Sequence, residues 1–334
     1  LFILLGVSIS DAGVAYLWLA AILLMLINQR FLCFAYAGSL VSLMALITGF
    51  PQIHVATLMA LVAILHLVES LLILVNGYHN ASPMFFKHKS GKVVGGFALR
   101  KFWPMPTIAL LAVVMLSSGM DLQSVPMPDW WPIFQPGLEV PESHVMLHIL
   151  FPLVVALGYS DFVQTELPKT KARRSAGMLL VYSLVLLSLA VLANAYSWLA
   201  ILPVTFAPLG HELVIYMGRR REKENSPIFL GEEGVMVLAV YPNSPAEQMG
   251  LEVGDVIRSI NGVALADQMS PWVIDPVFVV ENQFRLPAER RISFKGKVPP
   301  LGIVPAPHPE QGAYVRFKDG FLKSLWNKWR VKGK

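Results

Sequence analysis

The sequence predicts a polytopic α-helical membrane bundle followed by a small soluble α+β domain. Apolar residues make up 55% of the 334 residues and charged residues only 15%, whereas a soluble domain carries about 25% charged residues. The charges are also unevenly distributed. Residues 1–218 hold 10 basic and 9 acidic residues, and residues 219–334 hold 17 and 13. We therefore expect a transmembrane helical domain over 1–218 and a water-soluble part after it.

Seven stretches have the roughly 20 mostly apolar residues that a spanning helix needs. These predicted spans are 12–28, 31–49, 54–76, 104–119, 144–159, 175–193 and 197–217. Residues 1–9 are apolar but too short to span, and we interpret them as the end of a truncated eighth span. The alternative is a short turn lying on the bilayer.

Basic residues in short loops indicate the cytoplasmic side of a membrane protein. The expected loops 77–103 and 160–174 are basic, as is the segment 219–223, whereas loop 120–143 holds four acidic residues and no Lys or Arg. An alternating path through the seven spans puts all three basic segments inside and the acidic loop outside. The soluble part is therefore expected in the cytoplasm.

Ionisable residues within the predicted spans are candidates for function, because charged groups are costly in lipid. His66 and Glu69 are three residues apart, so they share a helix face and are expected to pair. His144 and His148 lie four apart in another predicted helix. His211 lies near the inner end of the last span, beside Glu212, and these histidines are expected at interface positions.

No catalytic residue, metal site or cofactor is predicted. The sequence has one cysteine, Cys33, which excludes a disulfide framework and a cysteine-rich zinc site. A zinc protease of the His-Glu-x-x-His type needs a second histidine one turn after His211-Glu212, but Ile215 stands there. The sequence also lacks a P-loop, a dinucleotide fingerprint and a nucleophile elbow.

The soluble part opens with an ordered series of strand, cap and turn signals. The apolar run 235–241 predicts a strand. The run 244–247 (SPAE) has the cap, first-turn proline and acidic third position of a helix start, and Gly250 is suited to ending that helix. Residues 256–260 predict a second strand, which the hairpin turn 261–262 (NG) follows.

This series closely resembles the core of a bacterial PDZ domain. The resemblance places the domain at 228–312, after a basic linker at 219–227. It implies a module that binds a partner's C-terminal peptide as an added strand. The groove-flanking helix maps to 269–283, where two prolines are expected to distort it.

The segment Leu301, Gly302, Ile303 and Val304 resembles the PDZ carboxylate-binding loop and the strand after it. The resemblance makes these four residues the predicted peptide-binding site. The alternative is an ordinary edge strand, which the neighbouring prolines would also allow.

The whole arrangement resembles the MinJ family of cell-division topological determinants. The resemblance rests on the many-span membrane part, the run 130–134 (WWPIF) and the PDZ segment 244–255 (SPAEQMGLEVGD). It implies a non-enzymatic adaptor in the bacterial cell membrane, at the septum and poles. Such an adaptor would link a DivIVA-like protein to a MinD-like protein and restrict septum placement.

Two other classes of membrane protein are alternatives. A site-2-type intramembrane protease also couples a PDZ domain to membrane helices, but its zinc motif is absent from this sequence. A small-solute transporter with a regulatory PDZ domain needs internal repeats, and no clear repeat is present.

Residues 313–334 form a basic tail with seven Lys/Arg and one acidic residue. Its apolar side chains recur with the spacing of one helix face, and its basic side chains fall mostly elsewhere. This pattern is typical of an amphipathic helix that faces anionic lipid. The residues predicted to contact lipid are Phe321, Lys323, Trp326, Lys328, Trp329 and Arg330. The alternatives are a helix packed on the PDZ domain or a solvated tail, and nucleic-acid binding is not expected because no recognised module accompanies the charge.

Deleting residues 319–334 is expected to weaken binding of the soluble region to anionic liposomes, because each base near such a surface contributes about 1 kcal/mol. Co-sedimentation with anionic and with neutral liposomes measures the effect. Equal binding of the two forms to anionic liposomes would contradict a lipid-binding tail.

Overall fold

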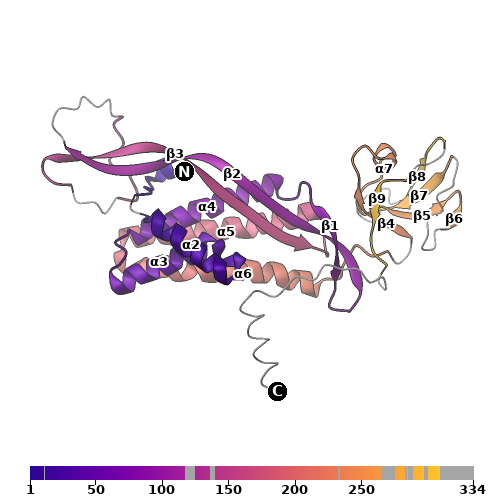
Figure 1. Cartoon of the computed structure of the whole chain (residues 1–334), viewed down its shortest axis with the longest axis horizontal. Helices are drawn as coiled ribbons and strands as arrows, with labels where there is room; N and C mark the ends of the chain where they lie inside the picture. The colour runs from indigo at the N-terminus through magenta and orange to yellow at the C-terminus, as the bar shows by residue number, and fades with distance from the viewer. Residues whose placement is uncertain are drawn as a thin grey trace, which may run out of the picture.

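The fold is given by a computed structural model (Figure 1). It describes residues 1–10, 12–116, 125–135, 140–231, 234–264, 275–282, 284, 289–296 and 300–308. The basic tail and the middle of the soluble domain, residues 265–274, lie outside these ranges.

Five helices form a bundle in the first two thirds of the chain (Figure 1). They are α2 (Val14–Ile27), α3 (Phe34–Thr48), α4 (Val55–Asn76), α5 (Pro168–Ala195) and α6 (Ile201–Glu224). Helix α4 is central, since its residues 55–66 are all buried. Small residues of α5 and α6, such as Ala176, Ala190 and Ala207, are also buried and allow close helix packing.

Among the described residues, three helices are long and apolar enough to cross a membrane: Val55–Asn76, Pro168–Ala195 and Ser197–Glu224. The seven predicted spans are therefore not confirmed. Helices α2 and α3 are apolar but have only 14 and 15 residues, fewer than the roughly 17 that a span needs. Within 1–9, the structure has a single-turn helix, α1 (Phe2–Leu5), and the expected eighth span stays a prediction.

The predicted spans 104–119 and 144–159 are wrong, because the described residues of both are β-strands. Strand β2 covers Val93–Leu116 and β3 covers His144–Val163. The two segments pair with each other along their described length, and this pairing, rather than their composition, selects the strand form. Hydropathy alone does not separate a buried strand from a helix.

The strands belong to a three-stranded antiparallel sheet in the order β1-β2-β3, with β1 at Ser82–Lys87. The ladder between β2 and β3 is unbroken from the pair Phe97–Val163 to the pair Leu116–His144. Figure 1 shows this long hairpin lying along the bundle and passing its end. Side chains such as Trp103, Met105 and Val155 pack against the bundle core.

The run 130–134 lies near the same end of the molecule as the hairpin tip. The Trp131 indole N–H donates to the Ile3 carbonyl at 2.7 Å, and Phe134 is buried. The Asn194 side chain, at the end of α5, donates to the Ile133 carbonyl at 2.8 Å. This run therefore ties the N-terminal residues to the bundle.

The soluble domain is an antiparallel sheet in the order β8-β7-β5-β4-β9, with β6 paired to β5. The strands are β4 (Val235–Val240), β5 (Val256–Ile260), β6 (Val263–Ala264), β7 (Val277–Glu281), β8 (Glu289–Ser293) and β9 (Ile303–Pro305). The prediction of a helix over 269–283 is wrong at 277–281, which form β7. Its alternating burial, with Phe278 and Val280 inward, is typical of a strand.

The predicted helix start in this domain is confirmed. Helix α7 covers Pro245–Gln248, and the Ser244 hydroxyl accepts a hydrogen bond from the Glu247 N–H at 3.3 Å. The Glu247 carboxylate accepts in turn from the N–H of Asn243, the residue before the cap, at 2.6 Å, so Glu247 also secures the chain at the helix start. The hairpin turn is also confirmed, with φ of 51° at Asn261 and 79° at Gly262.

The soluble domain docks on the base of the three-stranded sheet. Phe229 and Leu238 pack with Phe97 and Val163 in one buried cluster. The Gly95 N–H donates to the Phe229 carbonyl at 2.9 Å, and a side chain at position 95 would crowd both Leu238 and Phe229. The predicted linker at 219–227 is accordingly not a free segment, since α6 continues to Glu224 and the chain then joins this cluster.

A buried ion pair holds the bundle at the end next to the soluble domain. Lys171 on α5 and Glu222 on α6 are 3% and 2% exposed, and their Nζ and Oε1 atoms are 3.4 Å apart. Asp161 on β3 is 3.3 Å from the same Nζ. The Glu222 carboxylate also accepts from the Gln164 N–H at 3.0 Å, so the pair joins α5, α6 and the end of β3.

Replacing Glu222→Gln is expected to lower the free energy of unfolding by about 3 kcal/mol, because it leaves the buried Lys171 charge with Asp161 alone. Titration of the detergent-solubilised chain with a denaturing detergent measures the loss. Glu224→Gln is the matched control, since Glu224 pairs with Arg220 on the exposed surface of the same helix and should leave stability unchanged. Similar losses in the two variants would contradict a special role for the buried pair.

Candidate functional site

The predicted peptide-binding segment forms the outer edge of the soluble domain's sheet. Strand β9 pairs with β4, with Ile303 opposite Val240 and Val304 opposite Ala239. Leu301 is buried in the domain core. Strand β9 is last in the strand order, so within the described residues its second edge has no neighbouring strand (Figure 1).

The loop before β9 is anchored through its carbonyl groups. The Leu301 carbonyl accepts from the Ala246 N–H at 3.0 Å, and the Gly302 carbonyl accepts from the Tyr241 N–H at 2.8 Å. In a planar trans peptide the N–H points away from the C=O. The N–H groups of Gly302 and Ile303 are therefore directed away from these anchors, as a site for a carboxylate requires.

Gly302 is needed for this loop geometry. Its φ is 73°, a left-handed conformation that residues with a Cβ rarely adopt. A Cβ at this position would also overlap the Cβ of Ser244, the residue that caps α7. The carboxylate loop and the α7 cap are thus packed directly against each other.

The second wall of a PDZ groove is the flanking helix, and the first part of its predicted position, 269–274, falls within residues 265–274. These residues, including Pro271, lie outside the described part of the chain. The described part of the candidate site therefore consists of β9 and the loop before it. The six tail residues predicted to contact lipid also lie outside the described ranges.

The structure brings together three residues that the sequence keeps far apart. The Cys33 Sγ is 3.2 Å from the His66 Nε2 and 3.6 Å from the His211 Nε2. His66 Nδ1 bonds to the Val62 carbonyl at 2.8 Å, and among the described contacts no hydrogen bond joins it to Glu69. The predicted His66–Glu69 pair is therefore not formed. Sequence spacing missed the cluster because its three members come from different helices or helix ends.

The remaining singled-out histidines lie elsewhere. His144 and His148 are on β3 rather than on a helix, and the His148 ring contacts Trp131 with centroids 4.8 Å apart. Glu212 forms an ion pair with Arg30 and accepts a hydrogen bond from the Tyr36 hydroxyl at 2.5 Å.

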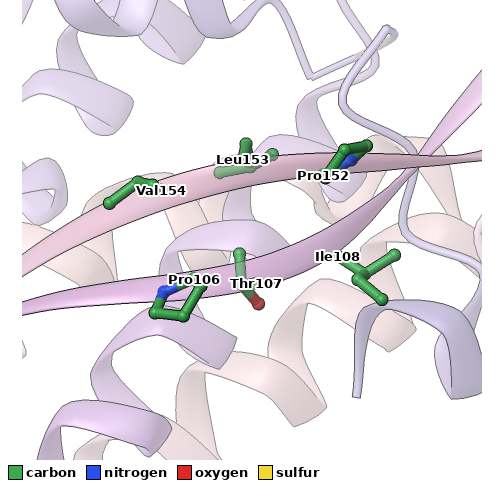
Figure 2. A pocket seen from close by; sticks show the side chains of 6 residues that line it. All are labelled: Pro106, Thr107, Ile108, Pro152, Leu153 and Val154. Carbon is green, nitrogen blue, oxygen red and sulfur yellow. The ribbon is translucent and has the colours of Figure 1, made fainter.

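Two hollows lie on the surface of the described part of the chain. An apolar one of about 440 Å³ lies between the strands of the hairpin and is lined by Pro106, Thr107, Ile108, Pro152, Leu153 and Val154 (Figure 2). Its one polar side chain is Thr107, so it offers no acid, base or metal ligand. The other, of about 570 Å³, lies along the charged end of α6, from Glu212 to Glu224.

Comparison with known proteins supports the PDZ assignment. A family model described as "PDZ domain" matches residues 236–273, which contain β4, α7 and β5. The C-terminal region therefore holds a PDZ domain. No solved structure matches the chain.

A curated relative matches a larger part of the chain. It is the "Cell division topological determinant MinJ" of Bacillus subtilis (strain 168), 24% identical over 234 residues. The match covers 67% of this chain and 54% of the relative, so the matched region spans about half of the relative's length. The resemblance to MinJ deduced from the residues is thus supported.

Replacing Gly302→Ala is expected to destabilise the domain more than Gly250→Ala. Both glycines have a φ of 73°, so each alanine costs about 1–2 kcal/mol of backbone strain. Only at position 302 does the new Cβ also meet Ser244, whereas it meets nothing within 4 Å at position 250. Overpacking adds about 1–3 kcal/mol. Free energies of unfolding measure the difference, and equal losses would contradict the close packing of the loop.

Proposed function

We propose that this protein is a membrane-anchored adaptor of the MinJ kind, which recruits cytoplasmic division proteins through its PDZ domain and restricts septum placement. The observation that carries the proposal is the match to MinJ over two thirds of the chain, together with a PDZ sheet whose outer strand has an open edge. In this proposal the chain acts by binding rather than by catalysis.

The open edge favours a short C-terminal peptide as ligand. The Ile303 N–H faces away from β4, and in a strand the N–H and C=O of one residue point to the same side. Ile303 can therefore pair with an added strand through both groups. Pro305 has no N–H, so the edge supplies few donors beyond the carboxylate loop. A terminal carboxylate at the Gly302 and Ile303 N–H groups would complete the binding.

We propose that the PDZ domain is cytoplasmic. The basic segments 77–103, 160–174 and 219–223 all lie near the ends of α4, α5 and α6 that face the PDZ domain (Figure 1). The hairpin runs along the bundle, so the described acidic residues near its tip, Asp129 and Glu142, are at the opposite end. Two of the predicted spans are strands instead, but this leaves the expected side of the membrane for each basic segment unchanged. The positive-inside rule therefore supports a cytoplasmic PDZ domain.

By resemblance to MinJ, the proposed partners are a DivIVA-like protein and a MinD-like protein, at the septum and cell poles. A site-2-type protease is less well supported because its His-Glu-x-x-His motif is absent. A transporter is less well supported because the sequence has no clear internal repeat.

The sidedness predicts which introduced cysteines an impermeant maleimide can label in intact cells. In a Cys33→Ser background, Asp129→Cys near the hairpin tip should react, and Asn243→Cys in the PDZ domain should react only after permeabilisation. Asp129 and Asn243 are both exposed, so burial does not confound the comparison. Labelling of position 243 in intact cells would refute a cytoplasmic PDZ domain.

The adaptor role is tested in Bacillus subtilis cells that lack their own MinJ. A fluorescently tagged chain should gather at septa and poles, and it should co-purify with division proteins. Gly302→Ala should lose this recovery, because its new Cβ crowds the loop before β9 against Ser244. Gly250→Ala has the same backbone strain but open space around its new Cβ, so it should retain the recovery. A uniform membrane signal with no division protein recovered would refute the proposal.

A further inference from the structure

We propose that Cys33, His66 and His211 bind one Zn²⁺ ion inside the helical bundle. Cys33 precedes α3, His66 is on α4 and His211 is on α6. One ligand atom from each residue lies within 4.8 Å of the other two. His66 is 3% exposed, and the other two residues are partly buried.

The spacing of the ligand atoms suits a tetrahedral ion. A zinc ion about 2.3 Å from sulfur and about 2.0 Å from nitrogen places these atoms about 3.5 Å apart. The Cys33 Sγ is 3.2 Å from one Nε2 atom and 3.6 Å from the other. Small side-chain adjustments are therefore enough to coordinate the ion.

The hydrogen bonds of His66 leave its Nε2 available as a ligand. Its Nδ1 is 2.8 Å from the Val62 carbonyl oxygen, which can only accept. Nδ1 must therefore carry the proton, and in the neutral ring Nε2 carries a lone pair. Metal-bound histidines characteristically donate their other N–H to a carbonyl or carboxylate in this way.

The same argument holds for His211. The Tyr36 hydroxyl donates its proton to the Glu212 carboxylate at 2.5 Å, so its oxygen accepts from the His211 Nδ1 at 3.3 Å. His211 Nε2 is then also a lone-pair atom. Arg30 pairs with the same Glu212 carboxylate oxygen and holds that carboxylate in place.

These assignments leave the cluster short of protons. Two Nε2 lone pairs face one thiol, and the thiol has a single proton to donate. One nitrogen therefore lacks a donor from the cluster, whichever way the S–H points. A metal ion resolves this, because Cys33 releases its proton to water, the thiolate binds the ion, and both nitrogens bind it as well.

The donor set selects the class of metal. One thiolate and two imidazoles suit Zn²⁺, whereas Mg²⁺ and Ca²⁺ prefer oxygen ligands. Three protein ligands leave a fourth position for water. The bound ion would join the start of α3 to α4 and α6, and Tyr182 of α5 packs on both imidazole rings, with centroids 5.4 and 5.8 Å away.

Metal analysis of the full-length chain in detergent tests the proposal. After incubation with zinc and desalting, we expect about one zinc ion per chain. Cys33→Ser, His66→Gln and His211→Gln should lose it, and the matched control His79→Gln, an exposed histidine outside the cluster, should retain it. Tyr36→Phe removes the oriented hydroxyl and should weaken zinc binding about 10- to 100-fold. No bound zinc, or equal zinc in all variants, would overturn the proposal.

A second measurement uses the unaltered chain and so does not depend on the folding of a variant. Cys33 is the single cysteine of the chain, so thiol labelling reports on it alone. A small permeant maleimide should react several-fold more slowly with zinc-loaded protein than after a permeant chelator, and added zinc should restore protection. An unchanged labelling rate would overturn the proposal, as would binding of Cu⁺ by a protein that takes up no Zn²⁺.

Discussion

The buried pair between Lys171 and Glu222 is the interaction on which the arrangement of the two parts depends. It joins α5 and α6 at the end where the chain leaves the bundle, and Glu222 also binds the backbone at the end of β3. Burying two charges costs solvation free energy that only close, complete pairing offsets. The bundle, the sheet and the exit of the chain are therefore positioned together.

That positioning determines how the PDZ domain is presented. Just beyond α6, Ile228 donates to the Gln164 carbonyl, and Phe229 lies in the cluster with Leu238 and Phe97. One face of the PDZ sheet is thus packed on the sheet of the membrane part, and the edge of β9 is held at a defined place relative to the bundle. For an adaptor, this means that a bound partner is held at a fixed position next to the membrane, rather than at the end of a flexible tether.

The PDZ domain is recognisable from the sequence, whereas the cluster of Cys33, His66 and His211 is recognisable only from the tertiary structure. The signals of the PDZ core lie in one continuous stretch of sequence, so the family match and the strand, cap and turn signals agree. In the cluster, Cys33 is 33 positions from His66 and 178 positions from His211. No rule of sequence spacing connects residues that far apart. The His-Glu-x-x-His pattern places both histidines on one helix, whereas His66 and His211 come from two helices.

The sequence by itself determined the boundary between the apolar and charged parts, the helix cap at Ser244, the turn at 261–262 and the PDZ-like order of strands. Each of these depends on composition or on contacts within a few residues, which local physical rules describe. Only the tertiary structure decided that 104–116 and 144–159 are strands, because their apolar character suits either form and pairing with each other selects one. It alone also placed Lys171 beside Glu222 and Cys33 between two histidines, since packing, not sequence distance, sets which side chains meet.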